Sequence, residues 1–156
     1  MQLRVFGRTG MQLSVLGFGC GAVGGIMVRG DPADQERTIA RAIAAGVNYF
    51  DTAVLYGDGE SETNLGRVLQ KLKPANAVVG TKVRLAPGEF GRIDDAVRRS
   101  LEGSLARLRL DRVDIGGEVT EEIVLGDPAE ALRVDIDIRH ARGWRTLLQQ
   151  RADRLA

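Results

Sequence analysis

Asp51, Tyr56 and Lys82 are the residues of this sequence whose types and spacing best suit acid–base chemistry. Asp51 ends a short apolar run, Tyr56 follows on the next loop, and Lys82 ends another apolar run roughly 30 residues later. A phenol has a reference pKa of about 10, and a neighbouring ammonium group lowers that pKa by favouring the phenolate. With the carboxylate holding the ammonium in place, such a tyrosine could protonate a carbonyl oxygen while a hydride reaches the carbonyl carbon.

The elements that must position these residues begin with a β-hairpin, because "LRVF" and "QLSVLGFG" flank the turn residues "GRTG". The first helix is predicted to start at Pro32, with Asp31 as its cap, and to end at Gly46. Its apolar stripe is Ile39, Ala42, Ile43 and Ala45.

Two more helices and three more strands follow in alternation. The strands are predicted at residues 47–51, at residues 77–83 and from residue 112 onward. Ser61 is expected to cap the helix that stops at Pro74, and a loop at residues 84–92 precedes the helix at residues 93–110. The apolar faces of these two helices are Leu65, Val68, Leu69 and Leu72, and Ile93, Val97, Leu101, Leu105 and Leu108.

The order hairpin, β, α, β, α, β, α, β predicts an α/β fold with a parallel sheet and right-handed crossovers. In such folds the functional residues gather where the strands end. Asp51 ends one strand and Lys82 falls near the end of the next, so the two are expected to lie side by side with Tyr56 on the loop above them.

The composition limits the classes of binding partner that are expected. With 156 residues the chain suits one domain, and 22 basic against 21 acidic residues leave no charge signature for nucleic acid or an anionic membrane. One cysteine and one histidine argue against a structural metal site, and no apolar run is long enough to span a bilayer. We expect a cytoplasmic protein with a small-molecule partner.

Four motifs, in order, resemble the aldo-keto reductase family from Leu3 to about Ile115. "FDTAVLYGDGESE" resembles the D-x-A-x-x-Y-G loop of that family, and "VVGTKV" resembles the strand that carries its lysine. "GRTGMQLSVLGFGCGAVGG" is similar to its N-terminal hairpin and first strand, and "SLARLRLDRVD" to its third helix and the start of its fourth strand.

The resemblance implies an NADPH-dependent reductase of aldehydes or ketones on a (β/α)8 TIM barrel. Tyr56 would be the general acid, Lys82 the cation that lowers its pKa, and Asp51 the carboxylate that orients Lys82. Gly19, Cys20 and Gly21 match the loop near the nicotinamide, so together with Asp51 they are the expected cofactor-binding residues.

The chain departs from the family pattern after Ile115. Where the family has a histidine at the end of strand four, "DRVDIGGEV" places Val119, and the only histidine, His140, comes 21 residues later. Gly116 and Gly117 are expected to weaken this strand. A full barrel needs about 250 residues, so we predict a partial barrel of about four β/α units at residues 1–115 and a divergent tail at 116–156, in the same domain or partly disordered.

Three interpretations of the chain therefore stay open. It is a reductase impaired by the missing histidine and the missing C-terminal cofactor loops, a non-catalytic half-barrel that serves as a self-associating or interaction module, or a truncated gene product. An open barrel exposes two sheet edges, so a homodimer that covers it is also predicted.

Other features have simpler interpretations. "GCGAVG" satisfies the G-x-G-x-x-G pattern of a Rossmann fold, but the helix signal comes only at Asp31 and no acidic residue follows at the expected distance. Tyr49 is expected to be ordinary strand packing, and Cys20 a small buried apolar residue.

Overall fold

The computed structural model describes residues 1–21, 23–85, 89 and 92–120 of the chain. The elements predicted beyond residue 120, and His140 with them, lie outside the described residues.

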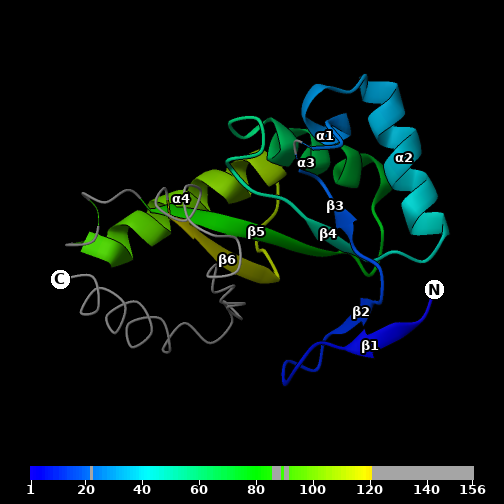
Figure 1. Cartoon of the computed structure of the whole chain (residues 1–156), viewed down its shortest axis with the longest axis horizontal. Coiled ribbons are helices and arrows are strands. Elements are labelled where there is room, and N and C mark those ends of the chain that lie inside the picture. The colour runs from blue at the N-terminus through cyan, green and yellow to red at the C-terminus, as the bar shows by residue number, and fades with distance from the viewer. Residues whose placement is uncertain (22, 86–88, 90–91, 121–156) are drawn as a thin grey trace.

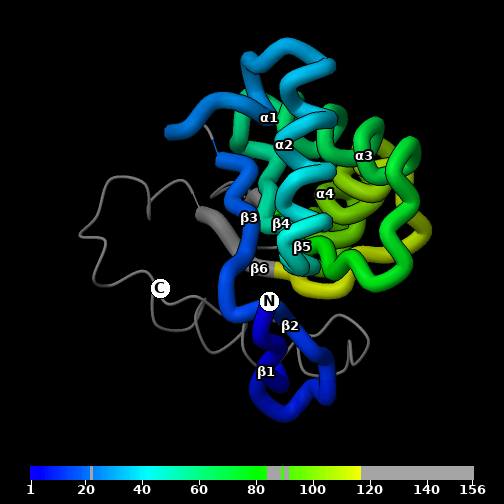
Figure 2. The backbone as a smooth tube through the Cα atoms, turned by 90° about the vertical axis from the view of Figure 1, so that its right-hand side faces the viewer, coloured from blue at the N-terminus to red at the C-terminus, as the bar shows by residue number. Residues whose placement is uncertain are grey.

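The N-terminal hairpin forms as predicted. Strands β1 (Leu3–Val5) and β2 (Gln12–Ser14) pair antiparallel, with Leu3 opposite Ser14. Asn48 joins the hairpin to the main sheet: its side-chain amide donates to Gln12 O at 2.8 Å, and its Oδ1 accepts from Ser14 N at 2.7 Å. The hairpin is thereby held at the end of the sheet where the strands begin (Figure 2).

The main sheet has four parallel strands in the order β3-β4-β5-β6, which confirms the predicted parallel topology (Figure 1). The strands are β3 (Phe18–Gly19), β4 (Tyr49–Asp51), β5 (Val78–Leu85) and β6 (Ile115–Thr120). Gly116 and Gly117 lie inside β6 and pair with Thr81 and Lys82, so the strand continues through them.

Three long helices connect the strands: α2 (Pro32–Ala44), α3 (Glu60–Leu72) and α4 (Ile93–Leu108). They lie together on one side of the sheet (Figure 2). The cap of α2 is as predicted, since Asp31 accepts a hydrogen bond from Ala33 N at 2.8 Å. A short helix, α1 (Ile26–Arg29), was not predicted, because four residues carry no periodic pattern.

The predicted cap of α3 was wrong. The capping position is Gly59, whose left-handed backbone (φ 90°) turns the chain into the helix. A Cβ atom at Gly59 would lie 2.7 Å from Arg107 Cδ, so a larger residue there would have to displace the Arg107 side chain as well as adopt the left-handed backbone. Ser61 is instead in the first turn, fully buried, and its hydroxyl donates to Cys20 O at 2.9 Å.

Burial alternates along β4, where Phe50 is buried between the partly exposed Tyr49 and Asp51, and so assigns the two faces of the sheet. Phe50, Val79 and Val83 are buried and belong to the core that the helices cover. The predicted stripe of α3 supplies Leu65, Val68 and Leu69 to that core. Asp51 and Lys82 lie at the alternate positions, on the face that would be the inside of a barrel.

Candidate active site

Asp51, the last residue of β4, meets Lys82 on the neighbouring strand β5, as their spacing predicted, although β5 continues past Lys82 to Leu85. The Lys82 Nζ atom lies 2.9 Å from each oxygen of the Asp51 carboxylate and donates a third hydrogen bond to Thr52 O at 3.0 Å. The exposed fractions of the two side chains are 23% for Lys82 and 36% for Asp51. Three acceptors therefore match the three N–H bonds of the ammonium group and fix its direction.

Tyr56 joins this pair from the loop after β4. The Lys82 Nζ atom lies 4.7 Å from the centroid of the Tyr56 ring, over its face, which is the geometry of a cation–π contact. Gly21 also lies beside this ring, because a Cβ atom added to Gly21 would meet it at 3.7 Å, an ordinary van der Waals distance. The structure thus brings together all three residues singled out from the sequence.

The predicted cofactor residues flank the same site. Gly19 pairs with Asp51 across β3 and β4, and Cys20 N donates to Asp51 O at 2.8 Å. Burial, and then the charge of Asp51, raises the pKa of the Cys20 thiol to about 12. Cys20 is therefore a neutral, buried thiol at physiological pH, as its interpretation as a small apolar residue implied.

A buried hydroxyl network supports the loop that carries Tyr56. Ser61 Oγ lies 2.9 Å from Thr52 Oγ1 and donates to Cys20 O, while Ser61 N donates to Tyr56 O at 3.1 Å. This one residue thus ties the ends of β3 and β4 to the first turn of α3. The sequence reasoning missed this role because a serine at a helix start was interpreted as a cap.

A buried carboxylate braces the same helix. Glu62 is fully buried, accepts from Thr81 Oγ1 at 2.6 Å and from Arg107 Nε at 2.7 Å, and so links α3 to β5 and α4. The signal was available in the acidic stretch "GESE", but nothing in the sequence showed which charge pairs with Glu62.

Tyr49 is another residue whose contact was missed, since its hydroxyl reaches Asp51 Oδ1 at 3.4 Å.

Val119, where the resemblance would place the family's histidine, belongs to β6. Val119 lies in that strand opposite Arg84. A valine has no polar side-chain atom, so it can neither donate a hydrogen bond to a carbonyl oxygen nor accept one.

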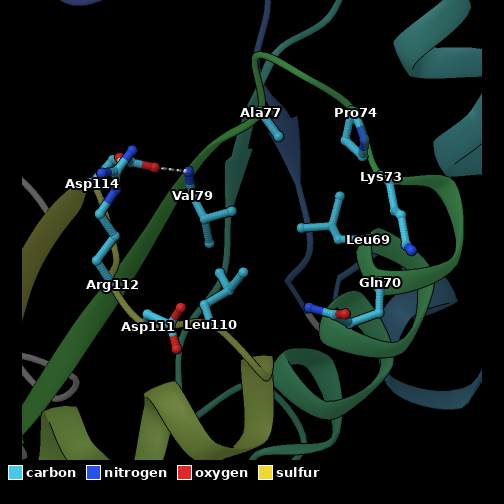
Figure 3. A pocket seen from close by; sticks show the side chains of 10 residues that line it. All are labelled: Leu69, Gln70, Lys73, Pro74, Ala77, Val79, Leu110, Asp111, Arg112 and Asp114. Carbon is cyan, nitrogen blue, oxygen red and sulfur yellow. Dashed lines mark hydrogen bonds and ion pairs between the residues drawn. The ribbon is translucent and has the colours of Figure 1, made fainter.

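A pocket of about 430 Å³ opens at the other end of the sheet (Figure 3). Its walls come from the last turn of α3, the start of β5 and the segment before β6, and Asp114 accepts a hydrogen bond from Val79 N at 3.1 Å there. None of the candidate catalytic or cofactor-binding residues lines this pocket.

Two further features concern the part of the chain that the structure describes. No helix in it has both the length and the apolar character needed to cross a membrane. Within the same residues, no group of three or more His, Cys, Asp or Glu side chains is placed to hold a metal ion.

Known proteins are similar to this chain in sequence and in fold over its N-terminal part. Residues 15–116 match the aldo/keto reductase family. An L-galactose dehydrogenase from Arabidopsis thaliana is 36% identical over 117 residues, and a pyridoxal 4-dehydrogenase from Microbacterium luteolum is 39% identical over 80. The matches cover 74% and 51% of this chain, but only 37% and 23% of those proteins.

Solved structures of aldo-keto reductases are also similar to this chain. A thermostable aldo-keto reductase in complex with the inhibitor epalrestat is 30% identical with a TM-score of 0.61, over 74% of this chain and 42% of that one. An aldo-keto reductase from Klebsiella pneumoniae in complex with NADPH is 28% identical with a TM-score of 0.57, over 74% and 38%. The chain belongs to the aldo/keto reductase family of NAD(P)H-dependent oxidoreductases, and its fold is a partial (β/α)8 barrel that spans less than half the length of these relatives.

Proposed function

We propose that this chain carries the proton-donating part of a carbonyl reductase site, which acts on a small aldehyde or ketone with NADPH. The observation that carries the proposal is the Asp51–Lys82 ion pair, whose ammonium group lies against the Tyr56 ring beside the carboxyl end of β4.

The residues around β3 fit a flat cofactor ring. A Cβ atom added to Gly19 meets nothing within 4 Å, so space is open directly beside Asp51. Gly19, Cys20 and Gly21 would line that space with backbone atoms, and Asp51 would border it. When bound, NADPH supplies the hydride that reduces the carbonyl carbon.

The chain's own residues supply the proton. Tyr56 donates its hydroxyl proton to the carbonyl oxygen, which becomes the alcohol oxygen of the product. The positive charge of Lys82 stabilises the phenolate that remains, and Asp51 keeps that charge in place. Because Val119 offers no hydrogen bond to the carbonyl oxygen, we propose that turnover by this chain is slower than in a site with a histidine there.

The test combines NADPH binding, measured by fluorescence titration, with turnover of a generic aldehyde. Tyr56→Phe and Lys82→Met are each expected to lower turnover by roughly 100-fold or more, the usual contribution of a positioned general acid. Lys71→Met is the matched control, because it removes a lysine that pairs with Glu36 on the surface, where the Lys71 side chain is 64% exposed. Turnover that survives both site variants would overturn the proposal.

A second candidate function is a non-catalytic module that associates with a second copy of the chain. Within the described residues the main sheet has two edges, at β3 and β6. Exposed apolar side chains gather on and next to the hairpin, namely Leu3, Val5, Val15 and Leu16. A dimer in sedimentation equilibrium, with neither NADPH binding nor turnover, would favour this candidate over the reductase.

A further inference from the structure

Tyr49 lies on the same face of the sheet as the proposed site. Side chains two residues apart on a strand point to the same face, so Tyr49 and Asp51 are neighbours on β4. The Tyr49 hydroxyl donates to Asp51 Oδ1 at 3.4 Å. Asp51 therefore accepts from two sides, from Lys82 at both oxygens and from Tyr49 at one.

Two glycines make room for the Tyr49 ring in this position. A Cβ atom at Gly17, just before β3, would lie 2.7 Å from Tyr49 Cδ1. A Cβ atom at Gly80, on β5, would lie 2.8 Å from the Tyr49 hydroxyl oxygen. Glycines inside or beside strands often mark such close approaches. The ring is thus confined between β3 and β5, and this confinement directs its hydroxyl toward Asp51.

We infer that Tyr49 is a positioning residue whose hydroxyl fixes the Asp51 carboxylate, so that both carboxylate oxygens stay bonded to Lys82. This inference rests on the proposed function. The need for such a contact follows from exposure, because the Asp51 side chain is 36% exposed and water competes for its oxygens. Without the hydroxyl, Lys82 is the only described residue that holds the carboxylate, so the carboxylate rotates more readily about its terminal bond and two of the three acceptors that fix the direction of Lys82 become less well placed.

The primary test reads Lys82 directly and needs no catalysis. The chain has three lysines, Lys71, Lys73 and Lys82, so lysine-labelled protein gives few NMR signals, and Lys82→Met assigns the one of interest. In Tyr49→Phe we expect the Lys82 ammonium protons to exchange with water several-fold faster, while those of Lys71 do not change. Thr9→Val is the control, since it removes a hydroxyl that bonds Phe6 O at 2.6 Å in the hairpin.

Gly80→Ala provides an independent variant, because its methyl group would occupy the place of the Tyr49 hydroxyl. It should reproduce the faster exchange of Lys82, and combining it with Tyr49→Phe should add little, as expected for two changes that act on one contact. Unchanged Lys82 exchange in both single variants would overturn the inference.

Kinetics separate this inference from the proposed function. If the chain reduces aldehydes, Tyr49→Phe should lower kcat by roughly tenfold with KM within about twofold, because the hydroxyl acts on Asp51 and not on the substrate. Loss of Lys82 protection in a chain without turnover would support Tyr49 and refute the reductase. Turnover with unchanged Lys82 exchange in Tyr49→Phe would do the reverse.

Discussion

Replacement of Arg107 by methionine should destabilise the fold through the carboxylate it leaves behind. Glu62 is fully buried and has two partners, Arg107 Nε at 2.7 Å and Thr81 Oγ1 at 2.6 Å. Removing one partner of a fully buried ion pair costs about 3–5 kcal/mol, because a charge stays in a medium of low dielectric constant. The Arg107 side chain is 31% exposed, which weakens the pair, and Thr81 still donates. We therefore expect a loss of about 2–3 kcal/mol.

Urea denaturation followed by circular dichroism measures this loss. Because the slope of the unfolding free energy is about 1–3 kcal/mol per molar urea, the midpoint should fall by roughly 1 M or more. Lys71→Met is the control: it breaks the exposed pair with Glu36 and should cost less than about 1 kcal/mol. Adding Glu62→Gln to Arg107→Met should restore part of the stability, since an amide carries no charge. A loss in Arg107→Met no larger than in Lys71→Met would refute the reasoning.

Three shorter predictions follow. Ser61→Ala should lower any turnover, measured by NADPH oxidation, by roughly tenfold, because the Tyr56 loop loses its hydrogen bond to the end of β3. A rate equal to that of the unchanged chain would show that this hydrogen bond does not position Tyr56. The pKa of Cys20 is about 12 in the folded chain against an ordinary 9.0, so the thiol ionises at lower pH in the unfolded chain, and the stabilisation present below about pH 9 is lost as the pH rises toward 12. Urea titrations between pH 8 and 11 should show the unfolding free energy falling for this reason, and Cys20→Ala should abolish this contribution to the fall. Val119→His should raise kcat more than it lowers KM, because it adds a hydrogen-bond donor. No change in either constant would count against the proposal that the missing histidine slows turnover.

Residues predicted from local pattern agree well with the structure. Asp31 caps α2, the stripe of α3 enters the core, and the strands alternate with helices in the predicted order. Capping depends on contacts within one turn, and amphipathic stripes depend on the helical repeat, so both are visible in adjacent residues. The convergence of Asp51 and Lys82 was also predictable, because consecutive strands of a parallel sheet lie side by side and bring residues from their carboxyl-terminal halves together.

Residues whose role depends on distant segments were missed. Ser61 was assigned to a cap, yet its hydroxyl bonds the carbonyl of Cys20, which is 41 positions away. Arg107 reaches Glu62 across 45 positions, and no periodicity in either helix indicates that pair. Tyr49 was assigned to packing because its ring suits a strand, while its hydroxyl direction depends on glycines from two other segments.

The sequence by itself indicated the alternation of strands with long helices and the three residues of the proposed acid–base site through their spacing, and it indicated the family through four motifs that resemble aldo-keto reductases. Only the tertiary structure decided which groups complete that site: Thr52 and Tyr49 around the ion pair, and Ser61 behind the Tyr56 loop. The physical reason is that a hydrogen bond depends on distance and direction in space, and folding brings together donors and acceptors whose separation in sequence carries no pattern.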